Sequence, residues 1–214
     1  MLENLIQFFH RYSATLLKLK ACIVLVCLPV SASAHLVDAR FGEFYNGMLH
    51  PLTTLMHVIP WLALGFLAGL QTLSLAKKVL LTFPFAVVVG AALTNFFSLQ
   101  VDLAYFNLAS ILILGFCLVF ARPLPAFVIM AFSGVFGVSH GLANANIELS
   151  GNGQLLYLSG VVLAAYLVIC FASAIAILIK QKPHWGKVAL RTIGSWIVAI
   201  GVIFGGFSIL NLSV

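Results

Sequence analysis

The 214-residue chain is 63% hydrophobic and only 7% charged, whereas a soluble domain carries roughly 25% charged residues. Its mean hydropathy is +1.15, so the chain needs lipid as its solvent, and no polar stretch is long enough to form a separate globular domain. The 11 Lys and Arg residues, which contribute to a net charge of +6, are scattered among apolar segments and form no basic stripe, which argues against nucleic-acid binding.

Residues 1–34 have the three parts of a secretory signal peptide. A basic start is followed by an apolar run over residues 21–30 and then by Ser-Ala-Ser-Ala at residues 31–34, which fits a cleavage site. The apolar run is shorter than the roughly 20 residues that a hydrocarbon core needs, unless Leu16 and Leu17 extend it into an uncleaved anchor. We expect cleavage after Ala34, which would leave His35 with an imidazole and a free α-amine that could chelate a metal.

Six apolar segments follow the signal, and each is long enough to cross a membrane as a helix. They cover residues 51–75, 79–97, 103–120, 124–142, 155–179 and 188–212. Gly65 with Gly69 and Gly201 with Gly205 form small-xxx-small pairs, which let helix backbones approach closely in lipid. We predict an all-α membrane protein, in which residues 35–214 form a single domain, a six-helix transmembrane bundle, after a cleavable N-terminal signal segment.

The charged residues between the segments predict the orientation of this bundle. Basic residues fall in the first, third and fifth connections: Lys77, Lys78, Arg122, Lys180, Lys182 and Lys187. By the positive-inside rule these connections are cytoplasmic, which places both mature termini in the periplasm of a multi-pass protein of the bacterial inner membrane. The acidic residues that remain after cleavage all fall on the periplasmic side: Asp38, Glu43, Asp102 and Glu148.

Polar residues near the periplasmic ends of the spans are candidates for function, because polar groups are costly at membrane depth. Pro51 at the first helical position would start the first span, so His50 would lie at its outer mouth. His57 would follow two turns, or about 10 Å, deeper on nearly the same face. The outer ends of the next three spans carry Asn95, Asp102, and His140 with Asn144.

Imidazole and carboxylate groups are suitable ligands for nickel, cobalt, zinc or copper(II) where several converge from different helices. The alternative is that each histidine only hydrogen-bonds a neighbouring helix, which is worth roughly 1 kcal/mol. The common depth of His50, His57, Asp102 and His140 favours a metal site over four separate structural contacts.

The sequence carries no pattern typical of an enzyme. We find no Ser-His-Asp arrangement, no P-loop and no paired catalytic carboxylates, and the glycines lie within apolar helices rather than between a strand and a helix. We therefore expect no enzymatic activity, no tightly bound cofactor and no ATP-driven transport by this chain alone.

Three stretches carry a family resemblance: Ala34-His35 after the signal, residues 44–52 together with His57, and residues 139–144. The positions that match G-F-x-x-G-F-x-H-P-x-x-G-x-D-H are Phe44, Gly47, His50, Pro51 and His57, and those that match H-G-H-A-H-G are His140, Gly141 and Ala143. On these residues the chain resembles the HupE/UreJ family, membrane proteins associated with hydrogenase and urease gene sets and regarded as nickel or cobalt permeases.

Four positions depart from the family pattern. Thr54 replaces a Gly, Met56 replaces an Asp, and Leu142 and Asn144 replace His. The loss of a carboxylate and two imidazoles weakens a site for a divalent ion, while Met56 beside His57 could add a thioether, which favours copper(I).

The resemblance implies a secondary permease that carries Ni²⁺ or Co²⁺ inward for metalloenzyme maturation, with copper or zinc as alternative cargo. The expected metal ligands are His35, Glu43 and His50 for capture, and His57, Asp102 and His140 for deeper binding. The substituted positions leave open a non-transporting accessory or assembly subunit of a metalloenzyme complex. The expected partners are the metal ion and the lipid bilayer, with no nucleic acid; a homo-oligomer and metalloenzyme maturation partners are compatible with either function.

Overall fold

The computed structural model describes residues 34–97 and 102–210, and for residues 34–41 it describes the backbone alone. The chain divides into two compact units, Met1–Arg40 and Phe41–Val214, and the second unit contains the helix bundle. The predicted signal peptide, residues 1–34, lies outside the described residues except for Ala34.

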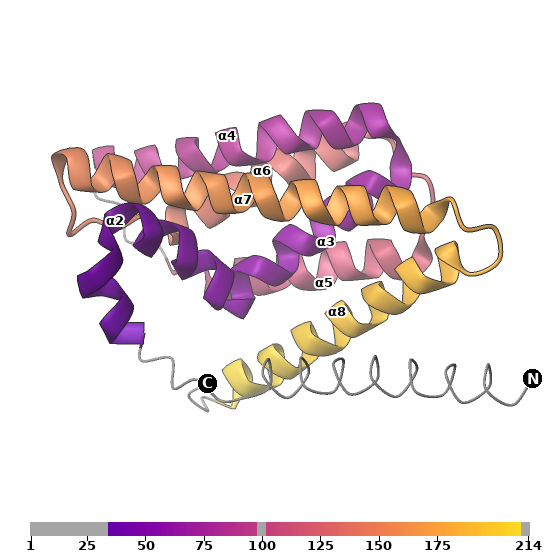
Figure 1. Cartoon of the computed structure of the whole chain (residues 1–214). Coiled ribbons are helices and arrows are strands. Elements are labelled where there is room, and N and C mark those ends of the chain that lie inside the picture. The colour runs from indigo at the N-terminus through magenta and orange to yellow at the C-terminus, as the bar shows by residue number, and fades with distance from the viewer. Residues whose placement is uncertain (1–33, 98–101, 211–214) are drawn as a thin grey trace, which may run out of the picture. The chain divides into compact units, whose positions relative to one another are not determined.

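Seven helices make up the regular structure of the described residues, and no strand lies among them. They are α2 (Ala34–Thr53), α3 (Leu55–Gln71), α4 (Leu73–Phe97), α5 (Ala104–Phe120), α6 (Ala126–Ala143), α7 (Gly151–Lys180) and α8 (Gly186–Ile209), labelled in Figure 1. The all-α class is confirmed, and a helix occupies each of the six segments that were expected to span the membrane.

Four of these helices, α4, α6, α7 and α8, are each long and apolar enough to cross a membrane. The segment Gly42–Thr53 and α3 qualify together, but a bend of 76° separates them, as in a broken span or a re-entrant loop. Helix α5 is apolar but has only 17 residues, which is near the lower limit for a span. It ends at Phe120 because Ala121 takes the left-handed conformation and Pro123 follows. By length and composition the described residues thus provide four or five spans, where the sequence suggested six.

The helices pack most closely in three pairs, α3 with α7, α4 with α6, and α5 with α8 (Figure 1). A Cβ atom built on Gly65 or Gly69 would lie 2.6 or 2.7 Å from the Cβ of an alanine on α7, so only glycine fits there. A Cβ atom built on Gly201 would lie 2.8 Å from the side chain of Leu112 on α5, whereas one built on Gly205 would make an ordinary contact of 3.5 Å with Leu108. The predicted role of the glycine pair on α3 in close helix packing is confirmed.

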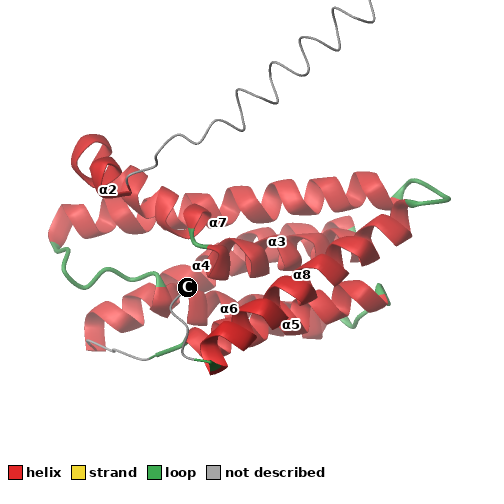
Figure 2. Ribbon diagram, turned by 90° about the horizontal axis from the view of Figure 1, so that it is seen from below, coloured by secondary structure: helices red, strands yellow, loops and turns green. Residues whose placement is uncertain are grey.

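The connections that carry basic residues meet at one end of the bundle. The Gln71 side chain donates to the Arg122 carbonyl at 3.2 Å, and Lys180 Nζ donates to the Gln71 carbonyl at 3.0 Å. The loop with Glu148 and the start of α5 beside Asp102 lie at the opposite end of the helices (Figure 2). We call these the basic end and the acidic end of the bundle.

Candidate metal centre

A bend between α2 and α3 places His50 beside His57. Thr54 has an extended backbone, which separates the end of α2 at Thr53 from the start of α3 at Leu55. The Thr54 hydroxyl donates to the His50 carbonyl at 2.8 Å, and the Thr53 hydroxyl donates to the Leu49 carbonyl at 2.9 Å, so both hydroxyls bond carbonyls in the last turns of α2. As a result the ring centroids of His50 and His57 lie 5.8 Å apart.

The prediction that Pro51 starts the first span is wrong. Pro51 lies inside the last turn of α2, which continues to Thr53 before the chain bends. A proline within a helix removes one backbone hydrogen bond and crowds the preceding turn, so it weakens α2 just ahead of the bend. His57 therefore does not lie about 10 Å below His50 on one helix face, as a continuous helix would require.

His57 and His140 meet inside the bundle. His57 lies near the start of α3 and His140 in the last turn of α6, yet their Nδ1 atoms are 3.0 Å apart. The side chain of His140 is fully buried and that of His57 is 8% exposed. Two buried imidazoles from different helices are thus in direct contact in the acidic half of the bundle.

Asn144 contacts the ring nitrogen of His57 that faces His140. Its Nδ2 donates to the His140 carbonyl at 2.8 Å, which sets the orientation of the amide because a carbonyl can only accept. The same Nδ2 lies 3.2 Å from His57 Nδ1. His57 Nδ1 therefore faces a donor, which favours a lone pair on Nδ1 and the ring hydrogen on Nε2.

Ser110 and Asn107 act in the same way on His140. Ser110 Oγ donates to the Asn107 carbonyl at 2.6 Å, whereas it lies 3.4 Å from His140 Nε2. Since a hydroxyl has one hydrogen and this one is directed to Asn107, the Ser110 oxygen faces His140 Nε2 as an acceptor. This arrangement favours the ring hydrogen of His140 on Nε2 and a lone pair on its Nδ1.

With both ring hydrogens on Nε2, two imidazole lone pairs face each other at 3.0 Å, and with a hydrogen on one Nδ1 the same contact is a ring-to-ring hydrogen bond. Two lone pairs at this distance repel unless a proton or a metal ion lies between them. Two imidazole nitrogens that bind one divalent ion at about 2.05 Å and at a right angle are about 2.9 Å apart. The donor set of His57 and His140 therefore fits a divalent transition metal, for which imidazole is a preferred ligand.

An amide oxygen and an aromatic wall complete the surroundings of the pair. Asn144 Oδ1 is buried and has no hydrogen-bond partner in the described part of the chain, so it is available as an oxygen ligand. Trp61 packs 6.0 Å from the His140 ring and 6.4 Å from the His57 ring, and Phe83 lies 6.5 Å from the His140 ring, all between centroids. These rings exclude water on the side of the pair that faces the interior of the bundle.

Two of the other predicted ligands, Glu43 and Asp102, form no group with this pair that could hold one ion. Glu43 packs beside Gly153 at the start of α7, and Asp102 is exposed, with its Oδ1 accepting the backbone N–H of Ala104 at 2.9 Å. The side chain of His35 lies outside the described residues. No group of three or more His, Cys, Asp or Glu side chains that could hold one ion occurs among the residues described.

Sequence reasoning did not single out Asn107, Ser110 and Ser139. Ser139 Oγ donates to Asn107 Oδ1 at 3.0 Å, so all three belong to the buried network behind His140. A usable signal was present, because Asn107 and Ser110 are one turn apart on an apolar helix and Ser139 precedes His140.

The fold and the site define a class: a multi-pass helical membrane protein with a buried two-histidine centre at the junction of α3 and α6. The chain matches the HupE / UreJ protein family over residues 23–204, and it belongs to that family. No curated protein and no solved structure matches it.

Proposed function

We propose that the protein is a secondary permease of the bacterial inner membrane that carries Ni²⁺ or Co²⁺ inward, with His57 and His140 as its central ligands. Membership of the family supports this cargo, because the HupE/UreJ family is associated with nickel or cobalt transport or with urease and hydrogenase maturation. The donor set is also compatible with copper or zinc.

One observation carries the proposal: the facing Nδ1 atoms of His57 and His140, 3.0 Å apart and held by separate hydrogen-bond networks. A histidine pair with a purely structural role is most stable when one ring donates a hydrogen bond to the other. Here the Asn144 amide donates toward His57 Nδ1 and the Ser110 oxygen faces His140 Nε2, and both contacts are compatible with two free Nδ1 lone pairs, which is the state that binds a cation.

The same geometry suggests how the ion reaches the pair. His50 is exposed and its ring contacts that of His57, so it can receive an ion at the acidic end and pass it inward. We assign capture to His50, Glu43 and His35, and we place Asp102 with this entrance because it is exposed at the start of α5. The acidic end then faces the periplasm, together with both mature termini, and the basic end faces the cytoplasm.

The test is metal binding and uptake by the purified mature protein in liposomes that contain a metal-sensitive dye. The double variant H57A/H140A should lose Ni²⁺ and Co²⁺ binding by more than about 100-fold and should not transport. H184A is the matched control, because His184 is exposed in the loop between α7 and α8 at the basic end. Equal uptake by the wild type and the double variant would exclude this pair from the transport path.

A second function is favoured by the small ligand set. The family positions at 56, 142 and 144 lack their metal ligands, and the described residues provide no group of three strong ligands. In this alternative the protein is a non-transporting accessory or assembly subunit of a metalloenzyme complex. Recovery of such a complex from gently solubilised membranes, combined with no metal uptake by the protein alone in liposomes, would establish it.

A further inference from the structure

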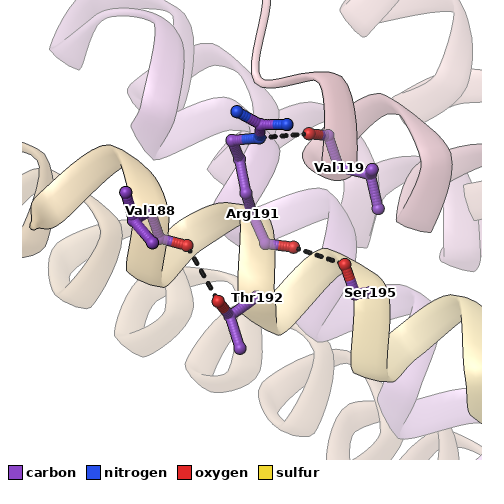
Figure 3. Close-up of a pocket in the computed structure, with 5 residues that line it drawn as sticks. All are labelled: Val119, Val188, Arg191, Thr192 and Ser195. Carbon is purple, nitrogen blue, oxygen red and sulfur yellow. Dashed lines mark hydrogen bonds between the residues drawn. The ribbon is translucent and has the colours of Figure 1, made fainter.

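The end of α5 and the first turns of α8 enclose a groove of about 240 Å³. Figure 3 shows its lining, in which one residue comes from α5 and four come from α8: Val119, Val188, Arg191, Thr192 and Ser195. The groove lies at the basic end of the bundle, far along the helices from the histidine pair at the acidic half. The groove is therefore separate from the candidate metal centre.

Arg191 is the charged group of this groove. Its side chain reaches from α8 toward α5, and its Nε donates to the Val119 carbonyl at 2.9 Å (Figure 3). This bond holds the guanidinium in place and satisfies a carbonyl in the last turn of α5. A guanidinium has five N–H donors, and the structure gives this one no other hydrogen bond within the described residues, so both terminal nitrogens remain for a ligand.

The charges around Arg191 favour an anionic ligand. The acidic side chains that the structure describes, Glu43, Asp102 and Glu148, do not reach this end of the bundle. Arg191 is exposed and has no carboxylate partner among the described residues, while its planar fork matches two oxygens of a phosphate.

Two hydroxyl groups on α8, the helix that carries Arg191, also line the groove. Thr192 Oγ1 donates to the Val188 carbonyl at 3.0 Å and Ser195 Oγ donates to the Arg191 carbonyl at 3.1 Å. Both oxygens lie on one face of α8, since the residues are three apart. A hydroxyl rotates freely, so each can donate to a bound anion instead of to its own helix.

Apolar side chains around the groove indicate that the anion belongs to a lipid. Phe120, Trp185 and Val188 are 62%, 54% and 61% exposed, and they lie near the ends of α5 and α8 where a membrane surface would cross the bundle. Tryptophan is enriched at such interfaces. A phosphate at Arg191 would thus have acyl chains positioned along exposed apolar surface.

We propose that the groove between the end of α5 and the start of α8 binds the phosphate of an anionic phospholipid, with Arg191 as its main contact and Thr192 and Ser195 as supporting donors. The site is independent of metal transport and of the histidine pair. Basic pockets between transmembrane helices at a cytoplasmic surface commonly bind such headgroups.

The test measures retention of phosphatidylglycerol and of phosphatidylcholine by the purified full-length protein in neutral detergent, by native mass spectrometry. The wild type should retain phosphatidylglycerol about tenfold better than phosphatidylcholine, and R191Q should lower this retention about tenfold. K187Q is the matched control: Lys187 is exposed one turn before Arg191 but does not line the groove, so the loss should be only about twofold.

A second variant separates lipid binding from a folding defect. S195L fills the groove with an apolar side chain on an exposed face of α8 and leaves Arg191 with its bond to Val119. It should lose phosphatidylglycerol as strongly as R191Q at unchanged thermal stability. Unchanged retention in S195L, or equal retention of both lipids by the wild type, would overturn the proposal. Binding of inorganic phosphate by the wild type under conditions where phosphatidylglycerol is not retained would do so too, because it would show a site for the free anion.

Discussion

At the scale of single residues, the candidate metal centre depends on side chains that never contact the ion. Ser110, which donates to Asn107, contacts His140 Nε2, and Asn144 contacts His57 Nδ1, so these side chains influence which ring nitrogen carries the hydrogen. Hydrogen bonds behind a ligand commonly change metal affinity by about 10–100-fold, because they decide which nitrogen is free to bind. The network therefore predicts effects at positions that a search for metal ligands would pass over.

Substitution S110A should lower Ni²⁺ affinity by about tenfold while the protein stays folded. Alanine removes the acceptor that holds the hydrogen of His140 on Nε2, so the hydrogen can move to Nδ1 and block the metal-binding lone pair. The measurement is calorimetric titration of Ni²⁺ into the purified protein. S133A is the control, since Ser133 is an equally buried hydroxyl that bonds Thr82 at 2.8 Å and does not touch the pair. Equal losses in both variants would mean that any buried hydroxyl matters and that the tautomer does not.

Restoring the family residue at position 144 should strengthen the site. Asn144 stands 3.2 Å from His57 Nδ1, so N144H would add a third imidazole next to the pair and should raise metal affinity about tenfold, or about 1.4 kcal/mol. L142H restores the other missing histidine of the same motif. Leu142 lies where α6 crosses Gly90 of α4, away from the pair, and its substitution should leave affinity unchanged. A larger gain from L142H than from N144H would show that the ion binds elsewhere.

At the scale of helices, the sequence predicted most of the fold because each span carries its own signal. Apolar length placed helices at all six segments, and the spacing of Gly65 and Gly69 predicted the close contact of α3 with α7. The sequence did not predict the bend at Thr54, because the position of Pro51 is typical of a helix start. In the structure Pro51 lies in the last turn of α2. That bend depends on packing of both segments and on hydroxyl-to-carbonyl bonds, which no local pattern records.

The candidate site was predictable only in part for a related reason. The polarity of His57 and His140 within apolar helices marked them as functional, but their distance depends on how α3 and α6 cross. Common depth predicted that Asp102 would join them, yet this exposed carboxylate accepts the backbone N–H of Ala104 instead. The position of a residue along its helix gives its depth in the membrane. Whether residues from different helices come together also depends on how the helices pack side by side, which the sequence does not show.

The contact of α3 with α7 should control both stability and metal binding. In G69A the new methyl would meet Ala176 and the backbone at Ser173, which should cost about 1–3 kcal/mol and move the helix that carries His57. G134A is the control, because a Cβ at Gly134 meets nothing within 4 Å, and it should leave stability equal or raise it by up to about 1 kcal/mol. Thermal unfolding in detergent, followed by Ni²⁺ titration of each variant, distinguishes them. Similar unfolding temperatures for the two variants would argue against a close-packed α3 and α7.

At the scale of the whole molecule, charge and site are arranged along the same axis. The connections at one end of the bundle carry Lys and Arg, and the histidine pair lies nearer the other end, where Asp102 and Glu148 are exposed. A cation that approaches the acidic end meets favourable charge and the exposed His50 before it reaches the buried pair, whereas the basic end repels it. Inward transport therefore requires the acidic end to face the periplasm, which is the orientation that the positive-inside rule also assigns.

This orientation can be measured by labelling single cysteines in intact cells. In a background with all four cysteines, Cys22, Cys27, Cys117 and Cys170, replaced by serine, D102C lies at the exposed acidic end and K182C at the exposed basic end. A maleimide that does not cross membranes should label D102C in intact cells and K182C only after the cells are permeabilised. The background protein without either cysteine gives the level of non-specific labelling. The reverse pattern would place the histidine pair on the cytoplasmic side, where the same ligands would collect metal for export or for delivery to a partner, and would exclude the uptake direction proposed here.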